Sequence, residues 1–80
     1  MIERLKIHHE LQVYADEHND KKELVTNHVY IGYQRDINAL LYHQWNNTFY
    51  ANQVAFSSKT IAKKAVDKIG IERLIKYYFN

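Results

Sequence analysis

The stretch that decides the fold is residues 56–79, which read FSSKTIAKKAVDKIGIERLIKYYF. Ser57 is the predicted N-cap of a helix, because its hydroxyl can accept a backbone N–H of the first turn. Phe56 and Ile61 then have the spacing of a hydrophobic staple. Gly70 stands just after the last turn of this helix, at the position where a residue with positive φ is favoured. The apolar pattern restarts after it. The stretch therefore predicts two helices that meet at an angle at Gly70.

The apolar residues of these two helices fall on arcs that we expect to face a common core. The predicted core positions are Phe56, Ile61, Ala65, Val66, Ile69, Ile71, Leu74, Ile75 and Tyr78. Within this set, Ile71 is expected to contact Val66 across the glycine. The opposite arc of the first helix is rich in lysine. Its lysines are Lys59, Lys63, Lys64 and Lys68. This arrangement is typical of a surface helix with one buried face.

Residues 1–18 contain no Gly or Pro and few β-branched residues, so they predict a further helix. Its apolar residues form two stripes on nearly opposite faces. The first stripe consists of Ile7, Leu11, Tyr14 and Ala15, and the second of Ile2, Leu5, His9 and Val13. We expect the first stripe to pack inward, which leaves the second as either a frayed chain start or a patch for a partner. The polar residues 16–22 predict a loop after this helix.

Between the helices, residues 28–56 change to the two-residue period and the β-branched and aromatic composition of strands. The three predicted strands are residues 28–34, 39–45 and 50–56. Asparagine-containing turns at residues 35–38 and 46–48 join them, and Gly32 indicates either a bulge or a close neighbour. The predicted fold is therefore α+β, in the order α-β-β-β-α-α, with a three-stranded antiparallel meander that the C-terminal helices cover.

Length and composition limit what this chain can be. Its 80 residues are enough for one small domain, residues 1–80, which buries about 60% of its unfolded surface. The absence of cysteine excludes disulfides and thiolate metal sites and favours a reducing cytoplasm. The sequence has neither a signal-peptide pattern nor an apolar run that approaches the roughly 20 residues of a membrane span. We therefore expect a cytoplasmic domain without a membrane partner.

Basic residues are concentrated in the C-terminal part of the chain. Residues 1–50 hold 5 Lys and Arg against 7 Asp and Glu, whereas residues 51–80 hold 6 against 2. The lysines either solvate the wet face of a helix or contact a nucleic acid. The 7 tyrosines offer a similar choice, because they either fill the rim of a thin core or stack on bases or on a protein. Solvation and packing are the favoured interpretations.

Motifs for metal binding and catalysis are incomplete. The HExxH zinc pattern that begins at His9 fails, because Val13 occupies the place of its second histidine. His28 and His43 could face each other across two strands, but such polar pairs are common without any ligand. Two glycines are too few for a glycine-rich phosphate-binding loop. We therefore predict no catalytic residue, no cofactor and no metal, in a chain that is not an enzyme.

The segment from Val54 to Gly70, VAFSSKTIAKKAVDKIG, and the closing LIKYYF resemble the C-terminal half of small uncharacterised proteins encoded by phages and prophages of Gram-positive bacteria. Those proteins end in an aromatic strand, a capped helix and a closing turn, and the resemblance extends over residues 29–79. Thr60 stands where they usually have Glu, so the complete capping box is absent. The resemblance implies cytoplasmic expression during phage replication, and it carries over no activity.

Two functions are consistent with these observations, and the oligomeric state stays open. The first is a non-enzymatic protein-interaction module that binds a host or phage protein. Its candidate partner patch consists of Ile2, Leu5, His9 and Val13. The alternative is a nucleic-acid-binding protein that combines a basic helix face with exposed tyrosines of the sheet. Its candidate contacts are Lys59, Lys63, Lys64 and Lys68.

Overall fold

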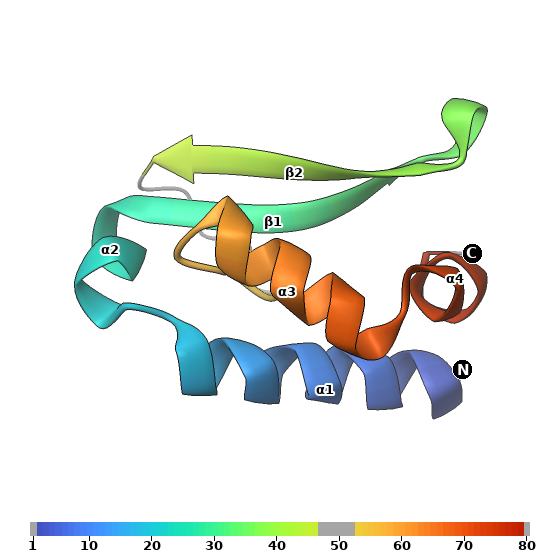
Figure 1. Ribbon diagram of the computed structural model, residues 1–80, viewed down its shortest axis with the longest axis horizontal. Coiled ribbons are helices and arrows are strands. Elements are labelled where there is room, and N and C mark those ends of the chain that lie inside the picture. The colour runs from blue at the N-terminus through green and yellow to red at the C-terminus, as the bar shows by residue number, and fades with distance from the viewer. Residues whose placement is uncertain (1, 47–52, 80) are drawn as a thin grey trace.

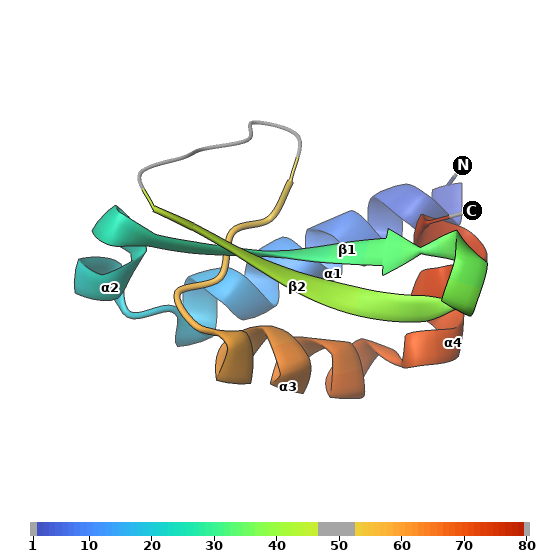
Figure 2. The same ribbon diagram turned by 90° about the horizontal axis from the view of Figure 1, so that it is seen from above.

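The computed structural model describes residues 2–46 and 53–79, which form helices and a two-stranded antiparallel sheet. The elements are α1 (Ile2–His18), α2 (Lys21–Thr26), β1 (Asn27–Gln34), a 3-10 turn (Arg35–Ile37), β2 (Ala39–Asn46), α3 (Lys59–Ile69), α4 (Ile71–Arg73) and a π-helical turn (Leu74–Tyr78). Figure 1 shows α1 and α3 on the same face of the β1–β2 hairpin, and Figure 2, seen from above, shows α1 passing beneath the hairpin with α3 along its β2 side. The predicted mixture of helix and sheet is confirmed.

The β1–β2 hairpin follows the predicted alternation. Its turn ends at Asn38, which has φ 50°, a left-handed conformation that asparagine tolerates. Pairing continues without a bulge along both strands. Gly32 therefore marks a close neighbour, because a Cβ at this position would lie 3.1 Å from the His43 ring.

The predicted third strand is not confirmed. Residues 47–52, with most of the turn predicted at 46–48, lie outside the described residues, and residues 53–55 form no strand. Phe56 pairs alone, through two backbone hydrogen bonds of 2.8 Å with Val29. Where the structure describes it, the segment therefore pairs with β1, whereas the third strand of a meander would pair with β2. Burial of the Phe56 ring fixes the segment there, and the chain turns into α3 before a ladder can form.

α3 begins one residue later than predicted. Its N-cap is Ser58, whose Oγ accepts the backbone N–H of Ile61 at 3.2 Å. Ser57, the predicted cap, is buried, and its Oγ accepts the backbone N–H of Asp20 at 3.0 Å. The Asn19 side chain completes this clamp by accepting the Ser57 N–H at 2.9 Å. Bonding to the α1–α2 link thus removes Ser57 from the cap position, and the predicted staple spacing is shifted as well.

Helical structure replaces most of the loop predicted at residues 16–22, because α1 continues to His18 and α2 begins at Lys21. α1 and α2 are separated by only Asn19 and Asp20. The Asp20 carboxylate caps α2, because it accepts the backbone N–H groups of Lys22 and Glu23 at 2.9 and 3.3 Å. The start of α2 is set by this capping carboxylate and not by apolar periodicity. The periodicity of the sequence therefore did not predict this helix.

One hydrophobic cluster joins α1, the hairpin, α3 and the C-terminal turn. Its buried members are Ile7, Leu11, Ala15, Val29, Val54, Phe56, Ala62, Ala65, Val66 and Leu74. Three further residues of the predicted core, Ile61, Ile69 and Tyr78, pack against this cluster but stay partly exposed. Ile75 is also half-buried. α3 therefore has the orientation that its apolar arc predicts.

The end of α3 confirms one prediction and corrects another. Gly70 has φ 106°, and its N–H donates to the Val66 carbonyl at 2.8 Å. Ile71, however, is 50% exposed and lies outside the core. Because ψ at Gly70 is 123°, the chain leaves α3 in an extended direction and not in the αL conformation of a Schellman ending. α4 therefore starts with Ile71 turned to solvent.

Candidate interaction surface

α1 presents its second apolar stripe to solvent. Ile2 and Leu5 are 78% and 66% exposed, and His9 and Val13 of the same stripe are exposed too. The first stripe, centred on Leu11, is buried in the core, as expected. The helix starts at Ile2, so the exposed stripe lies on regular helical turns and not on a frayed chain start. The four patch residues therefore share one accessible face.

A groove of about 350 Å³ lies beside this stripe, between α1 and α3. Its lining residues are His9, Glu10, Val13, Tyr14, Lys68 and Ile69. His9 and Val13 thus belong both to the stripe and to the groove wall, whereas Lys68 comes from the lysine arc of α3. The fold brings together residues from the two candidate sites. We call the stripe and the groove together the α1 surface.

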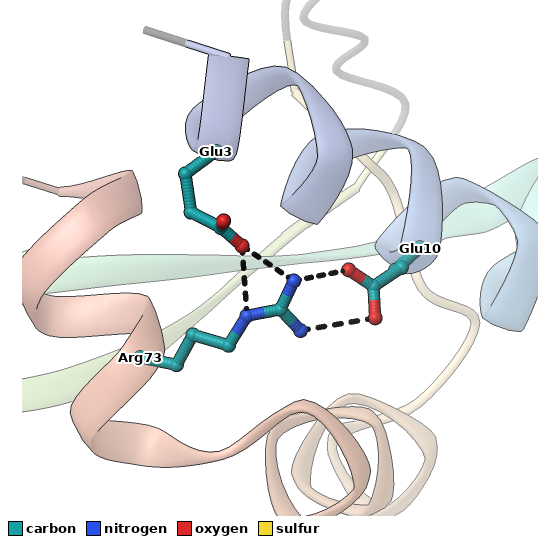
Figure 3. Close-up of polar contacts among 3 residues, drawn as sticks. All are labelled: Glu3, Glu10 and Arg73. Carbon is teal, nitrogen blue, oxygen red and sulfur yellow. Dashed lines mark hydrogen bonds and ion pairs between the residues drawn. The ribbon is translucent and has the colours of Figure 1, made fainter.

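Arg73 of α4 ties the C-terminal part of the chain to α1. Figure 3 shows its guanidinium between two carboxylates, with Nη1 and Nη2 donating to the two oxygens of Glu10 at 3.0 and 2.7 Å. Nε and Nη2 donate to Oε1 of Glu3 at 3.1 and 2.6 Å. The hydrogen bonds from Arg73 lower the pKa of Glu10 despite its partial burial, and those to Glu10 and Glu3 raise the pKa of Arg73.

The Arg73 contact is a feature that sequence reasoning missed. The sequence places Glu3 and Glu10 on one side of α1, but it does not indicate which basic residue pairs with them. The contact matters for the α1 surface because Glu10 lines the groove and is held by Arg73. Lys68, which also lines the groove, forms no ion pair with a residue that the structure describes.

The lysine arc of α3 is exposed along its length. Its residues are Lys59, Lys63, Lys64 and Lys68. Lys63 Nζ lies 5.7 Å from the centre of the Tyr42 ring, and Lys68 Nζ lies 5.5 Å from the centre of the Tyr14 ring. Lys63 thus lies against a tyrosine of β2 and Lys68 against a tyrosine of α1, so the two contacts belong to different flanks of α3 and do not form one shared groove. The ammonium groups also cover ring faces on which bases would stack.

Three of the six described tyrosines belong to the rim of the core. Tyr14, Tyr42 and Tyr78 pack against the hydrophobic cluster while remaining partly exposed. Burial raises the pKa of Tyr42 and that of Tyr78. Within residues 2–46 and 53–79, Tyr77 is the one exposed tyrosine, at 44%, and Tyr50 lies outside these residues. This distribution favours packing as the main role of the tyrosines.

The histidines are not gathered into one site. His8 Nδ1 lies 2.9 Å from the Tyr78 hydroxyl. The sequence allowed His28 to face His43 across the two strands. In the observed register, however, His28 lies opposite Trp45. In the part of the chain that the structure describes, no group of three or more His, Cys, Asp or Glu side chains could hold a metal ion.

Comparisons with known proteins give no match. No protein-family model matches the chain, and neither a curated protein nor a solved structure is significantly similar to it. The helices in the described ranges lack the length and apolar character that crossing a membrane would require. Function has to be inferred from the geometry of the chain itself.

Proposed function

We propose that this chain is a non-enzymatic, cytoplasmic interaction module that binds a host or phage protein through the α1 surface. The observation that carries this proposal is the exposure of Ile2 and Leu5, two large aliphatic side chains one turn apart on a helix whose other face is buried. Apolar groups gathered on one accessible face are typical of sites that a partner covers. The resemblance to phage and prophage proteins supports a partner from the host or the phage.

The α1 surface fits a partner helix. Its stripe recurs at the three- and four-residue spacing that a second helix meets when it packs along the first. Lys68 lines the groove and Lys64 precedes it by one turn of α3, so the α3 side of the surface is positively charged. Charge complementarity therefore points to an amphipathic partner helix with an acidic flank.

The test is affinity capture from a host lysate with the wild type, Leu5→Glu and Ile37→Glu. Leu5 and Ile37 are exposed to 66% and 62%, so both variants lose a similar apolar group and gain the same charge in different elements. The partner should be retained by the wild type and by Ile37→Glu and lost with Leu5→Glu. Equal retention by all three, or no protein above the control, contradicts the proposal.

A second pair of variants tests the charge of the partner. With the captured protein in hand, Lys68→Glu should weaken binding more than Lys63→Glu, because Lys68 lines the groove whereas Lys63 lies over Tyr42 on the sheet side. The difference should grow at low salt, where exposed charges are screened less. Equal effects of the two variants would show that the acidic flank is not part of the recognition.

Nucleic-acid binding is the alternative function, and the exposed lysine arc of α3 favours it. Because Tyr14 and Tyr42 are covered by lysines, contacts would go to phosphates and not to bases. Fluorescence anisotropy with single- and double-stranded oligonucleotides at low salt tests this function. Binding should weaken steeply with salt, and Lys64→Gln should reduce the salt slope by about one. No binding, or binding that salt does not change, removes the alternative.

A further inference from the structure

A second cavity, of about 370 Å³, opens between α1, the hairpin and the last described residues of the chain. It shares no lining residue with the α1–α3 groove, so it is independent of the proposed partner surface. The apolar part of its lining consists largely of Leu11, Ile31, Val54 and Phe56. Its volume falls within the range of about 300–1,000 Å³ that is typical of small-molecule sites.

Arg4 supplies a permanent positive charge to this cavity. Its guanidinium lies 5.7 Å from the centre of the Tyr78 ring, and it forms no ion pair with any residue that the structure describes. Arg73, in contrast, is held by two carboxylates. No Asp or Glu of the described ranges lines the cavity. An arginine that has no carboxylate partner among the described residues, beside a cavity with both polar and apolar lining, is suited to bind a carboxylate or a phosphate.

Aromatic rings form one wall of the cavity. Tyr33 and Phe79 are stacked with 5.9 Å between ring centres, and Tyr78 meets Phe79 edge-on at 4.9 Å. Both tyrosine hydroxyls are engaged, because Tyr33 donates to Asn38 at 2.7 Å and Tyr78 is bonded to His8 at 2.9 Å. These bonds hold the rings in place, so the wall is preformed and needs little ordering when a ligand binds.

Gly32 and His43 form another part of the lining. Because Gly32 has no Cβ, the His43 ring can lie against the backbone of β1. Gln53 adds a side-chain amide to the same cavity. The imidazole and the amide can both hydrogen-bond an anionic group whose charge is balanced by Arg4.

We propose that this cavity binds a small organic anion, with an apolar or aromatic body against the ring wall and a carboxylate or phosphate at Arg4. The absence of acidic residues from the described lining selects against cations. The cavity volume limits the ligand to about the size of one or two rings.

The test is an NMR titration of the full chain with benzoate, phenyl phosphate and the uncharged benzyl alcohol. The anions should shift the backbone amide signals of Gly32, Tyr33 and Phe79, and at least one should bind roughly tenfold more tightly than the alcohol. The tighter of the two anions identifies the head group. Shifts confined to other surfaces, or equal binding of the alcohol, overturn the proposal.

Two charge variants locate the anion. Arg4→Gln should abolish the preference for anions and leave binding of benzyl alcohol unchanged. Lys6→Gln is the matched control, because Lys6 is exposed on the same helix and does not line the cavity. It should keep the preference. An Arg4→Gln variant that still prefers anions, or a Lys6→Gln variant that does not, shows that the anion binds elsewhere.

A steric variant tests the cavity itself. Gly32→Ala places a methyl group 3.1 Å from the His43 ring, so the ring must move and change the shape of the cavity. Binding of all three compounds should weaken, and the hairpin should persist because Gly32 does not have a positive φ. Unchanged binding of all three compounds would place the ligand outside this cavity.

Discussion

α1 and α3 belong to the same core, but they relate to solvent in different ways. α3 is apolar on one side, and lysines cover the other. α1 is apolar on two sides, and one of them is buried while the other stays exposed. A one-sided pattern determines which face turns inward, whereas a two-sided pattern leaves two choices. The second face of α1 is therefore informative about function, because the core does not account for it.

The largest expected effect compares the two faces of α1. Leu11 is 2% exposed, so Leu11→Ala should lower the free energy of unfolding by about 2–5 kcal/mol through lost burial and a new cavity. Leu5→Ala, on the exposed face, should change it by no more than about 0.5 kcal/mol. Urea unfolding followed by circular dichroism measures both values. Similar losses for the two variants would mean that both faces of α1 are buried in solution.

A smaller effect is expected where α3 ends. Gly70→Ala should cost about 1–3 kcal/mol, because φ 106° with ψ 123° is sparsely populated by residues that carry a Cβ. The nearest atom to the added methyl is the Cβ of Arg73 at 3.9 Å, so the cost is conformational and not steric. Thermal unfolding measures this cost. A neutral or stabilising substitution would show that the chain leaves α3 by another route.

The attachment of α4 to α1 should depend on pH. The pKa of Glu10 is lowered from its ordinary value of 4.5, chiefly by the hydrogen bonds from Arg73. A carboxyl with a lower pKa in the folded than in the unfolded chain stabilises the fold above the unfolded value, and this contribution disappears as the pH falls through the folded value. The difference in stability between the wild type and Arg73→Gln should therefore be present at pH 7 and shrink below about pH 4.

Lys76→Gln is the matched control for this pH dependence. Lys76 is an exposed cation on the turn that follows α4, and no carboxylate of the described chain pairs with it. Urea unfolding of the wild type and both variants between pH 7 and about pH 3 gives the comparison. If the Arg73→Gln difference stays constant over this interval, ionised Glu10 is not the group through which Arg73 stabilises the fold.

The smallest expected effect concerns the exposed face of α3. Lys64 lies on this face and belongs to no ion pair among residues 2–46 and 53–79. Lys64→Ala should therefore change the free energy of unfolding by no more than about 0.5 kcal/mol. The same urea experiment measures it. A loss above about 1 kcal/mol would mean that the lysine arc contributes to folding and is not simply solvated.

The parts of the fold that local chemistry specifies could be predicted from the sequence. The orientation of α3, the positive φ of Gly70 and the turn before Asn38 depend on residues within a few positions of one another. The start of α3 could not be predicted in the same way, because the tertiary bond to Asp20 takes Ser57 away from the cap. The pairing of Phe56 with β1 likewise depends on burial of a ring and not on strand periodicity.

The candidate surface was predictable in part. Helical periodicity groups Ile2, Leu5, His9 and Val13 on one face, but it does not decide whether that face is buried. The groove beside them and the approach of Lys68 arise from packing between α1 and α3, which no local pattern encodes. The Arg73 contact belongs to the same class, because its partners lie at the opposite end of the described chain.

Arg73 follows Glu3 by 70 residues and Glu10 by 63. During synthesis α1 therefore leaves the ribosome well before the helices that complete its packing exist. At about 5–20 residues per second, the delay is roughly 3–14 seconds. Throughout this time Leu11 has no complete core to enter, so the nascent helix offers apolar side chains on both faces, Leu5 included. Until α3 and α4 have been synthesised, neither apolar face of α1 is packed in a complete core.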